Sequence, residues 1–85
     1  DLMAMGAYLA IKEVGLQIPR DVAVVGFDNI PTAKLVSPPL TTVDQFQRRV
    51  GQRAAEMLFE RLSGNAPLTG RSEEQPYSLI VREST

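Results

Sequence analysis

The sequence predicts an α/β fold, in which helices flank a sheet that contains parallel strands. The main support is the apolar run Val22–Phe27, which is followed directly by Asp28 and Asn29. A short continuous apolar run bounded by turn residues is typical of a strand that is buried on both faces of a parallel sheet. A helical pattern over Asp1–Val14 precedes this run across a short turn, and this order is half of a βαβ unit.

The first helix is expected over Asp1–Val14, with apolar residues on most of its surface. Its polar face is narrow and consists of Tyr8, Lys12 and Glu13. A helix that is apolar nearly all round is buried on more than one side, so we expect one side to face a sheet and another to face a partner subunit. Asp1 can serve as the N-cap or as a favourable first-turn charge, and Gly15 suits a left-handed C-cap.

A second strand and a second helix are predicted after a proline-rich connection. Leu40–Val43 is rich in β-forming residues and predicts a short strand. The helix is expected over about Phe46–Ser63, with Gly64 closing it. One apolar stripe at a spacing of 3.6 residues consists of Val50, Ala54, Met57, Leu58 and Leu62. Tyr77–Val81 predicts a last strand.

Charged residues fill the rest of the second helix. Glu56 and Glu60 are expected to pair with Arg residues three or four positions away, and each such pair adds about 0.2–0.5 kcal/mol. The cluster of Arg48, Arg49 and Arg53 could form a phosphate patch, but interleaved Glu and Gln favour a solvated face. The polar, turn-rich segment 65–75 is predicted to be the most mobile part of the chain.

Composition excludes several kinds of site. The 85 residues contain 9 Lys and Arg against 10 Asp and Glu, a net charge of −1, with no Cys and no His. Disulfides and thiolate metal sites are therefore excluded, and the commonest metal ligand and general base is missing. The charge balance argues against a nucleic-acid footprint in this stretch. No apolar run approaches the roughly 18 residues of a membrane span. No signal peptide is visible, and the start within a helical pattern predicts a segment of a longer protein.

Asp28 and Asn29 are the strongest candidates for a binding site. In open α/β sheets, ligands bind in the crevice beyond the carboxyl ends of the strands, which is where Asp28 is expected. A carboxylate there can accept hydrogen bonds from sugar hydroxyls or from ring N–H groups, and such charge-assisted bonds are roughly twice as strong as neutral ones. The alternative is an ordinary turn, because Asp and Asn both favour turns.

The sequence contains no recognisable catalytic set. It has no His or Cys, no Gly-x-Ser-x-Gly elbow and no glycine-rich phosphate loop. Glu73 and Glu74 lie in the polar segment 65–75, where we expect no partner that would shift their pKa values. We therefore predict that this chain is not an enzyme and needs no cofactor or metal.

Four segments carry a further signal. They are DLMAMGA (1–7), GLQIPRDVAVVGFDN (15–29), SPPLTTV (37–43) and LIVREST (79–85). In this order and spacing they resemble the carboxyl-terminal third of the LacI/GalR family, the lactose-repressor and galactose-repressor type of transcription regulator. The resemblance extends over essentially the whole chain except residues 65–75.

The resemblance implies a cytoplasmic regulator with a two-lobed, periplasmic-binding-protein-like (type I) fold, in which parallel sheets are flanked by helices. Residues 1–43 and 76–85 would belong to the carboxyl-terminal lobe, and residues 46–72 would pack on the amino-terminal lobe. A small-molecule effector, a sugar or a related compound, would bind in the cleft between the lobes. The effector would alter the operator DNA affinity of a helix-turn-helix domain that these 85 residues do not include.

The resemblance also assigns roles to individual positions. The positions that match the family's effector contacts are Asp28, Asp1, Gln45 and Gln47. Some family members carry a ligand-stacking aromatic residue where this chain has Gln47, with Phe46 one place earlier. The positions that match surfaces used to form a homodimer are Met5, Leu2, Leu9, Leu35 and Val36.

Two other functions remain open at this point. A periplasmic sugar-binding protein of a transporter shares the architecture and would differ by a signal peptide in place of the helix-turn-helix. The SPPLTT and REST segments favour the regulator. A free-standing interaction module would fit the apolar first helix, but the half βαβ unit argues against it. The sequence does not predict the effector's identity, the operator or the direction of the response.

Overall fold

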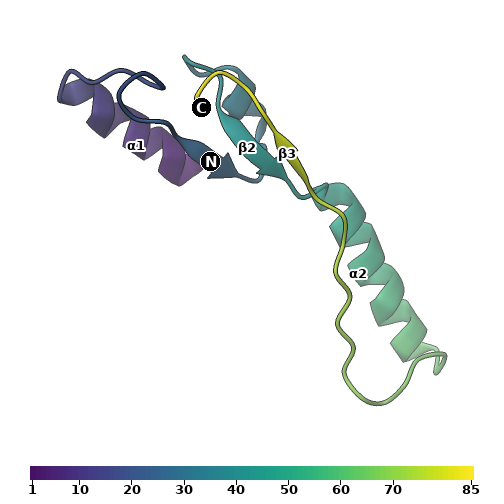
Figure 1. Ribbon diagram of the computed structural model, residues 1–85. Coiled ribbons are helices and arrows are strands. Elements are labelled where there is room, and N and C mark those ends of the chain that lie inside the picture. The colour runs from purple at the N-terminus through teal and green to yellow at the C-terminus, as the bar shows by residue number, and fades with distance from the viewer.

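The computed structural model describes all 85 residues, and its central feature is a small sheet between two helices (Figure 1). The elements along the chain are α1 (Leu2–Glu13), β1 (Val25–Phe27), the 3-10 turn η1 (Pro31–Lys34), β2 (Thr41–Asp44), α2 (Gln47–Leu62) and β3 (Ser78–Ile80). Each predicted helix and strand is confirmed, with ends that differ by at most three residues. Neither helix is long and apolar enough to cross a membrane.

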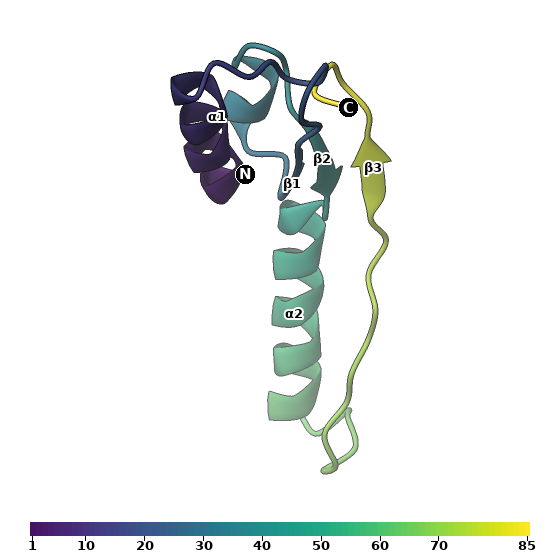
Figure 2. The ribbon, with the colours of Figure 1, turned by 60° about the vertical axis from the view of Figure 1, so that its left-hand side comes forward.

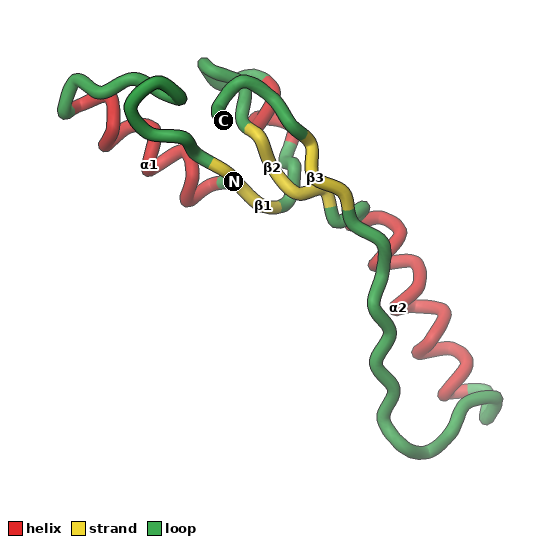
Figure 3. Tube along the Cα trace, in the orientation of Figure 1, coloured by secondary structure: helices red, strands yellow, loops and turns green.

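The sheet is mixed, with strand order β1–β2–β3. β1 and β2 are parallel, with Gly26 opposite Thr42, and this pairing confirms the prediction that the sheet contains parallel strands. β3 is antiparallel to β2, with Thr42 opposite Ile80, because the chain returns to the sheet after α2 instead of crossing over it. Figure 3 shows this return as one long loop beside α2. β2 is therefore the central strand.

One face of the sheet is covered by α1, and the contact defines the core. The buried apolar residues are Ala4, Tyr8, Val24, Ala33 and Leu40. The prediction that Tyr8 lies on the polar face of the helix is wrong, because Tyr8 is only 5% exposed. Its hydroxyl donates to the carbonyl oxygen of Pro38 (2.8 Å), so the ring is buried while its polar end is satisfied. This burial raises the pKa of Tyr8.

The other face of the sheet is open. The prediction that the first strand is buried on both faces is wrong in this chain, because Val25 is 56% and Phe27 is 51% exposed. Successive side chains of a strand point to opposite faces. Val24 packs in the core with α1, and Val25 and Phe27 consequently point to the face that no helix covers.

Both α-helices end in the way the sequence predicts. Gly15 and Gly64 adopt left-handed conformations, with φ of +79° and +80°. After α1, the N–H of Leu16 donates to the carbonyl oxygen of Ile11 (3.1 Å). After α2, the N–H of Asn65 donates to the carbonyl oxygen of Glu60 (2.9 Å). These are Schellman caps, which satisfy carbonyls that a helix end leaves free.

α2 extends away from the sheet instead of packing on it (Figure 2). The molecule measures 59 × 18 × 16 Å, and its radius of gyration is 18.1 Å. A compact chain of this length would have a radius of gyration of about 12 Å. No residue of α2 is buried, and its predicted apolar stripe is exposed, as Leu58 (56%) and Leu62 (72%) show.

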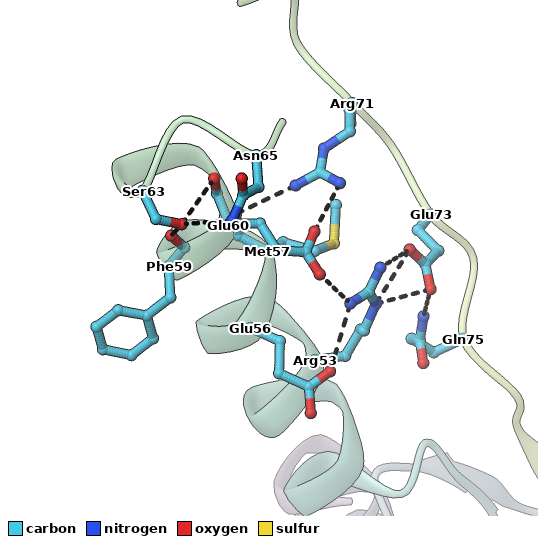
Figure 4. A network of polar contacts seen from close by, with 10 residues as sticks. All are labelled: Arg53, Glu56, Met57, Phe59, Glu60, Ser63, Asn65, Arg71, Glu73 and Gln75. Carbon is cyan, nitrogen blue, oxygen red and sulfur yellow. Dashed lines mark hydrogen bonds and ion pairs between the residues drawn. The ribbon is translucent and has the colours of Figure 1, made fainter. Parts of the chain in front are cut away.

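Residues 65–77, here called the strap, run back alongside α2 to β3 (Figures 2 and 4). Arg53 forms ion pairs with Glu73 (2.9 Å), Glu60 (3.2 Å) and Glu56 (3.3 Å), and Arg71 pairs with Glu60 (2.9 Å). The prediction for Glu56 is confirmed. The prediction for Glu60 is wrong, because its partners are seven positions earlier and on the strap. Glu73 does have a partner, contrary to our expectation, because the strap folds back onto the helix.

Candidate functional site

The loop after β1 has an unusual backbone. Asp28 and Asn29 have φ of 113° and 52°, values that residues with a side chain rarely adopt. Three consecutive N–H groups of this loop have partners from other elements. Asp28 donates to the carbonyl of Val43 (2.8 Å), Asn29 to Oγ1 of Thr42 (3.3 Å), and Ile30 to Oδ2 of Asp1 (2.8 Å). The surrounding structure thus holds the loop in a conformation that costs of order 1–3 kcal/mol per residue.

Asp1 lies behind this loop. Its Oδ2 accepts the bond from Ile30, and its Oδ1 accepts a bond from the Thr42 hydroxyl (2.6 Å). Asp1 occupies the N-cap position of α1, but its side chain makes no capping bond, because both oxygens are used elsewhere. The structure thus gives Asp1 a supporting role behind the loop, and its direct contact with an effector stays a prediction.

Gly26 makes this arrangement possible. A Cβ atom at this position would lie 2.2 Å from Oδ1 of Asp1 and 2.8 Å from Cδ2 of Leu40. Both distances are shorter than real Cβ contacts, so a side chain here would displace the carboxylate of Asp1. The glycine of the VVGFDN segment therefore serves close packing beside the strained loop.

The structure brings Asp28, Gln45 and Gln47 together. The side-chain amide of Gln45 donates to Oδ1 of Asp28, and that of Gln47 donates to the main-chain carbonyl of Asp28 (2.9 Å). Asp28 and Gln45 are half-buried, and Gln47 is exposed. Oδ2 of Asp28 accepts no hydrogen bond within the chain, so a half-buried acceptor is left for a donor from outside.

Phe46 lies between the two glutamines in a left-handed conformation, with φ 52° and ψ 57°. Its N–H donates to Oδ1 of Asp44 (2.8 Å), two residues earlier. An Asp side chain that bonds to the backbone two residues on closes a tight turn. This turn separates β2 from α2, and the residues on either side of Phe46 both reach Asp28.

An apolar groove of about 380 Å³ lies on the open face of the sheet, where α2 and the strap leave it. Its lining residues are Phe27, Val43, Gln45, Val50, Glu73, Gln75, Pro76 and Tyr77. Gln45 belongs both to this groove and to the Asp28 cluster. A mostly apolar hollow with a few placed polar groups is typical of small-molecule sites.

Asn29, which the sequence predicts as a candidate, is bonded to Arg82 and Asp44, two residues that sequence reasoning missed. Arg82 donates from Nη2 to Oδ1 of Asn29 (2.8 Å) and from Nη1 to the carbonyl of Leu40 (2.9 Å). The Asn29 amide in turn donates to Oδ2 of Asp44 (3.1 Å). The REST segment was visible in the sequence, but no local pattern pairs Arg82 with a residue 53 positions earlier. No group of three or more potential ligand side chains could hold a metal ion.

The residues expected at a dimer surface are partly gathered. Met5, Leu9 and Val36 line a second hollow of about 290 Å³ between α1 and the segment after η1, with Tyr8, Lys12 and Ser37. Leu2 (78%) and Leu35 (76%) are exposed but do not line this hollow. The surface is thus apolar and accessible, and its role in forming a dimer stays a prediction.

Comparisons with known proteins agree with the fold. The family model of the periplasmic binding protein-like domain matches residues 1–85. The HTH-type transcriptional repressor PurR of Pasteurella multocida is 43% identical over 84 residues, which is 99% of this chain and 25% of that protein. The chain therefore spans about a quarter of the length of this curated relative.

Solved structures resemble the whole chain. A lac repressor dimer bound to operator and the anti-inducer ONPF has a TM-score of 0.90 and 39% identity, over 100% of this chain and 29% of that one. A LacI family regulator from Arthrobacter sp. FB24, in complex with lactose, has a TM-score of 0.84 and 40% identity, over 100% of this chain and 32% of that one. The chain belongs to the periplasmic binding protein-like domain family, in the form found in LacI-type transcription regulators.

Proposed function

We propose that this chain is the part of a LacI-type transcription regulator that binds a small-molecule effector and contributes to a dimer. The observation that carries the proposal is the half-buried Asp28 carboxylate at the carboxyl end of β1, with one oxygen held by Gln45 and the other free. Crevices at such strand ends are where ligands bind in open α/β folds. The named relatives are repressors, which favours regulation over transport and over catalysis.

The chemistry of the cluster favours a sugar. The free oxygen of Asp28 accepts a hydrogen bond, and the amide oxygens of Gln45 and Gln47 add further acceptors beside it. A polyhydroxylated ligand offers several donors of this kind, while the neighbouring apolar groove can cover a ring face. The lactose complex of the Arthrobacter relative supports the same class.

In this proposal Asp28, Gln45 and Gln47 contact the effector, with Asp1 beside them. The surface of Met5, Leu2, Leu9, Leu35 and Val36 packs against a second copy. Residues 1–43 and 76–85 form part of one lobe, and residues 46–72 pack on the other. Effector binding alters operator affinity only by as much as the effector's affinity differs between the two lobe arrangements. A regulator of this kind acts on DNA in the cytoplasm.

Calorimetry of the intact protein with lactose and with ribose tests the site. Asp28→Asn keeps the shape but removes the charge, so we expect the affinity for the sugar that binds to fall by about 10- to 100-fold. The matched control is Asp21→Asn, which lies in the turn before β1 and contacts only the local backbone N–H of Gln17 through its side chain. Unchanged affinity in Asp28→Asn would remove Asp28 from the site.

A further inference from the structure

We infer that Arg82 is a positioning residue for the proposed effector site, and that it acts through Asn29 and Asp44. The inference rests on the proposed function only for the claim that the site binds an effector. The contacts form one continuous path. It runs from Arg82 to Asn29, from Asn29 to Asp44, and from Asp44 to the N–H of Phe46, which lies between the two glutamines that reach Asp28.

The first step of the path has only one possible orientation. The guanidinium of Arg82 can only donate, and the carboxylate of Asp44 can only accept. The Asn29 amide between them must therefore turn its oxygen toward Arg82 and its nitrogen toward Asp44, as the distances of 2.8 and 3.1 Å show. A flipped amide would place two donors together and two acceptors together, so this orientation is determined by chemistry.

The second step passes through Asp44. One oxygen of Asp44 accepts the Asn29 amide, and the other accepts the N–H of Phe46. Both bonds are needed to hold the carboxylate in place, because a side chain bonded at one oxygen only can rotate. Phe46 has a left-handed conformation that is unfavourable for a residue with a side chain, so the bond to Asp44 stabilises the turn that places Gln45 and Gln47.

Arg82 is itself firmly placed. Its main-chain N–H donates to the hydroxyl of the buried Thr41 (2.8 Å), and its Nη1 donates to the carbonyl of the buried Leu40 (2.9 Å). The guanidinium thus spans two acceptors, Leu40 and Asn29, with two separate N–H groups. A Lys ammonium keeps the charge but is a compact donor, so it cannot reproduce this fork.

The test uses Arg82→Lys in the intact protein with ¹⁵N-labelled Asn and Gln side chains. The Lys variant keeps the charge and the backbone anchor to Thr41. We expect the NMR signals of the Asn29, Gln45 and Gln47 side-chain amides to shift in the absence of any ligand. A merely structural role would lower the melting temperature without moving these particular signals. Arg20→Lys is the matched control, because Arg20 is exposed and its side chain contacts only Gln17.

Asn29→Asp interrupts the hydrogen-bonded path between Arg82 and Asp44, and it is the second variant to test if Arg82→Lys folds poorly. The new carboxylate still accepts from Arg82, but it faces the Asp44 carboxylate with no donor. We expect the Gln45 and Gln47 signals to shift as they do in Arg82→Lys. The inference is overturned if these two signals stay at their wild-type positions in both variants, even when the Asn29 backbone signal moves.

Binding adds a second readout. If the wild-type protein binds lactose, we expect Arg82→Lys to weaken that binding by about tenfold, and Arg20→Lys to leave it unchanged. Wild-type affinity in Arg82→Lys would overturn the inference. If the wild-type protein binds neither lactose nor ribose, the proposed sugar class fails. The amide signals alone then decide whether the path exists, so the two failures are distinguishable.

Discussion

The two ends of this molecule are held together by different interactions. Every buried residue lies in the sheet end, formed by α1, the three strands and the terminal segment 82–85, or in the connections within it. The other end, α2 with the strap, contains none and is held by ion pairs that are partly exposed to solvent. Exposed pairs contribute little, typically 0–1 kcal/mol each, whereas burial of one large apolar side chain contributes about 1.5–3 kcal/mol. The sheet end therefore has a core of its own, whereas α2 exposes apolar side chains such as Leu58 and Leu62 and has none.

Removing a core side chain should show this difference most strongly. Leu40 is fully buried and directly precedes β2, so Leu40→Ala in the intact protein should lower the free energy of unfolding by about 2–4 kcal/mol. Leu68→Ala, in the strap, is the matched control, because Leu68 is 90% exposed among these 85 residues and makes no apolar contact in the core. We expect a change of less than about 0.5 kcal/mol, and a larger loss would mean that the other lobe covers Leu68. Urea titration measures both. Equal losses in the two variants would refute the contrast.

Replacing a glycine by alanine should lower the free energy of unfolding at the sheet end and raise it in α2. Gly26→Ala forces a methyl group against Asp1 and Leu40, so we expect a loss of about 1–3 kcal/mol. Gly51 lies inside α2 with no atom within 4 Å of an added Cβ, so Gly51→Ala should stabilise the protein by about 0.5–1 kcal/mol. Thermal unfolding of the two variants distinguishes the signs. A destabilised Gly51→Ala would mean that another part of the intact protein packs closely on that side of α2.

Acid should release the strap, with the smallest effect of the three. Bonds from Arg71 and then Arg53 lower the pKa of Glu60, and bonds from Arg53 and then Gln75 lower the pKa of Glu73, both from an ordinary 4.5. Because the folded pKa values are lowered, the stabilisation is fully present above pH 4.5 and is lost as the pH falls below it through the folded values. The NMR order parameters of the backbone amides of residues 65–77 should therefore fall at low pH.

The matched control for this acid effect is the Glu60→Gln/Glu73→Gln double variant. Neutral amides cannot titrate, so the order parameters of its strap should be low already at pH 7 and change little with acid. Residues 41–44 in the same samples report on the sheet. If the order parameters of the wild-type strap fall no earlier than those of residues 41–44 as the pH falls, the ion pairs are not what holds the strap.

Local patterns predicted the elements and their ends well. The spacing of apolar residues placed both helices, and Gly15 and Gly64 marked their C-caps, because capping depends on neighbouring residues only. The sequence also placed Asp28 at the end of β1. Local patterns could not predict which side of α1 packs against the sheet. Tyr8 is buried because its hydroxyl finds an acceptor on Pro38, 30 residues away.

The same limit applies to the candidate site. Gln45 and Gln47 came from a resemblance, and the structure shows that they reach Asp28. Arg82 and Asp44 were missed, because their roles depend on contacts with Asn29 across the sheet, at separations of 53 and 15 residues. Hydrogen bonds over such separations leave no periodic trace in the sequence. Exposure of β1 was also unpredictable, because it depends on what else covers the sheet.

The pairing of β2 with β3 has a mechanical consequence. The chain leaves the sheet for α2 just after Asp44 and comes back just before Ser78, and these two residues are paired across neighbouring strands. α2 and the strap are thus attached by two adjacent connections instead of one. Two adjacent attachments permit bending about the line that joins them, but they resist twisting, because a twist would pull the paired strands apart. We therefore expect α2 and the strap to move as a unit by hinge bending about the Asp44–Ser78 pair, with little rotation about the long axis of α2.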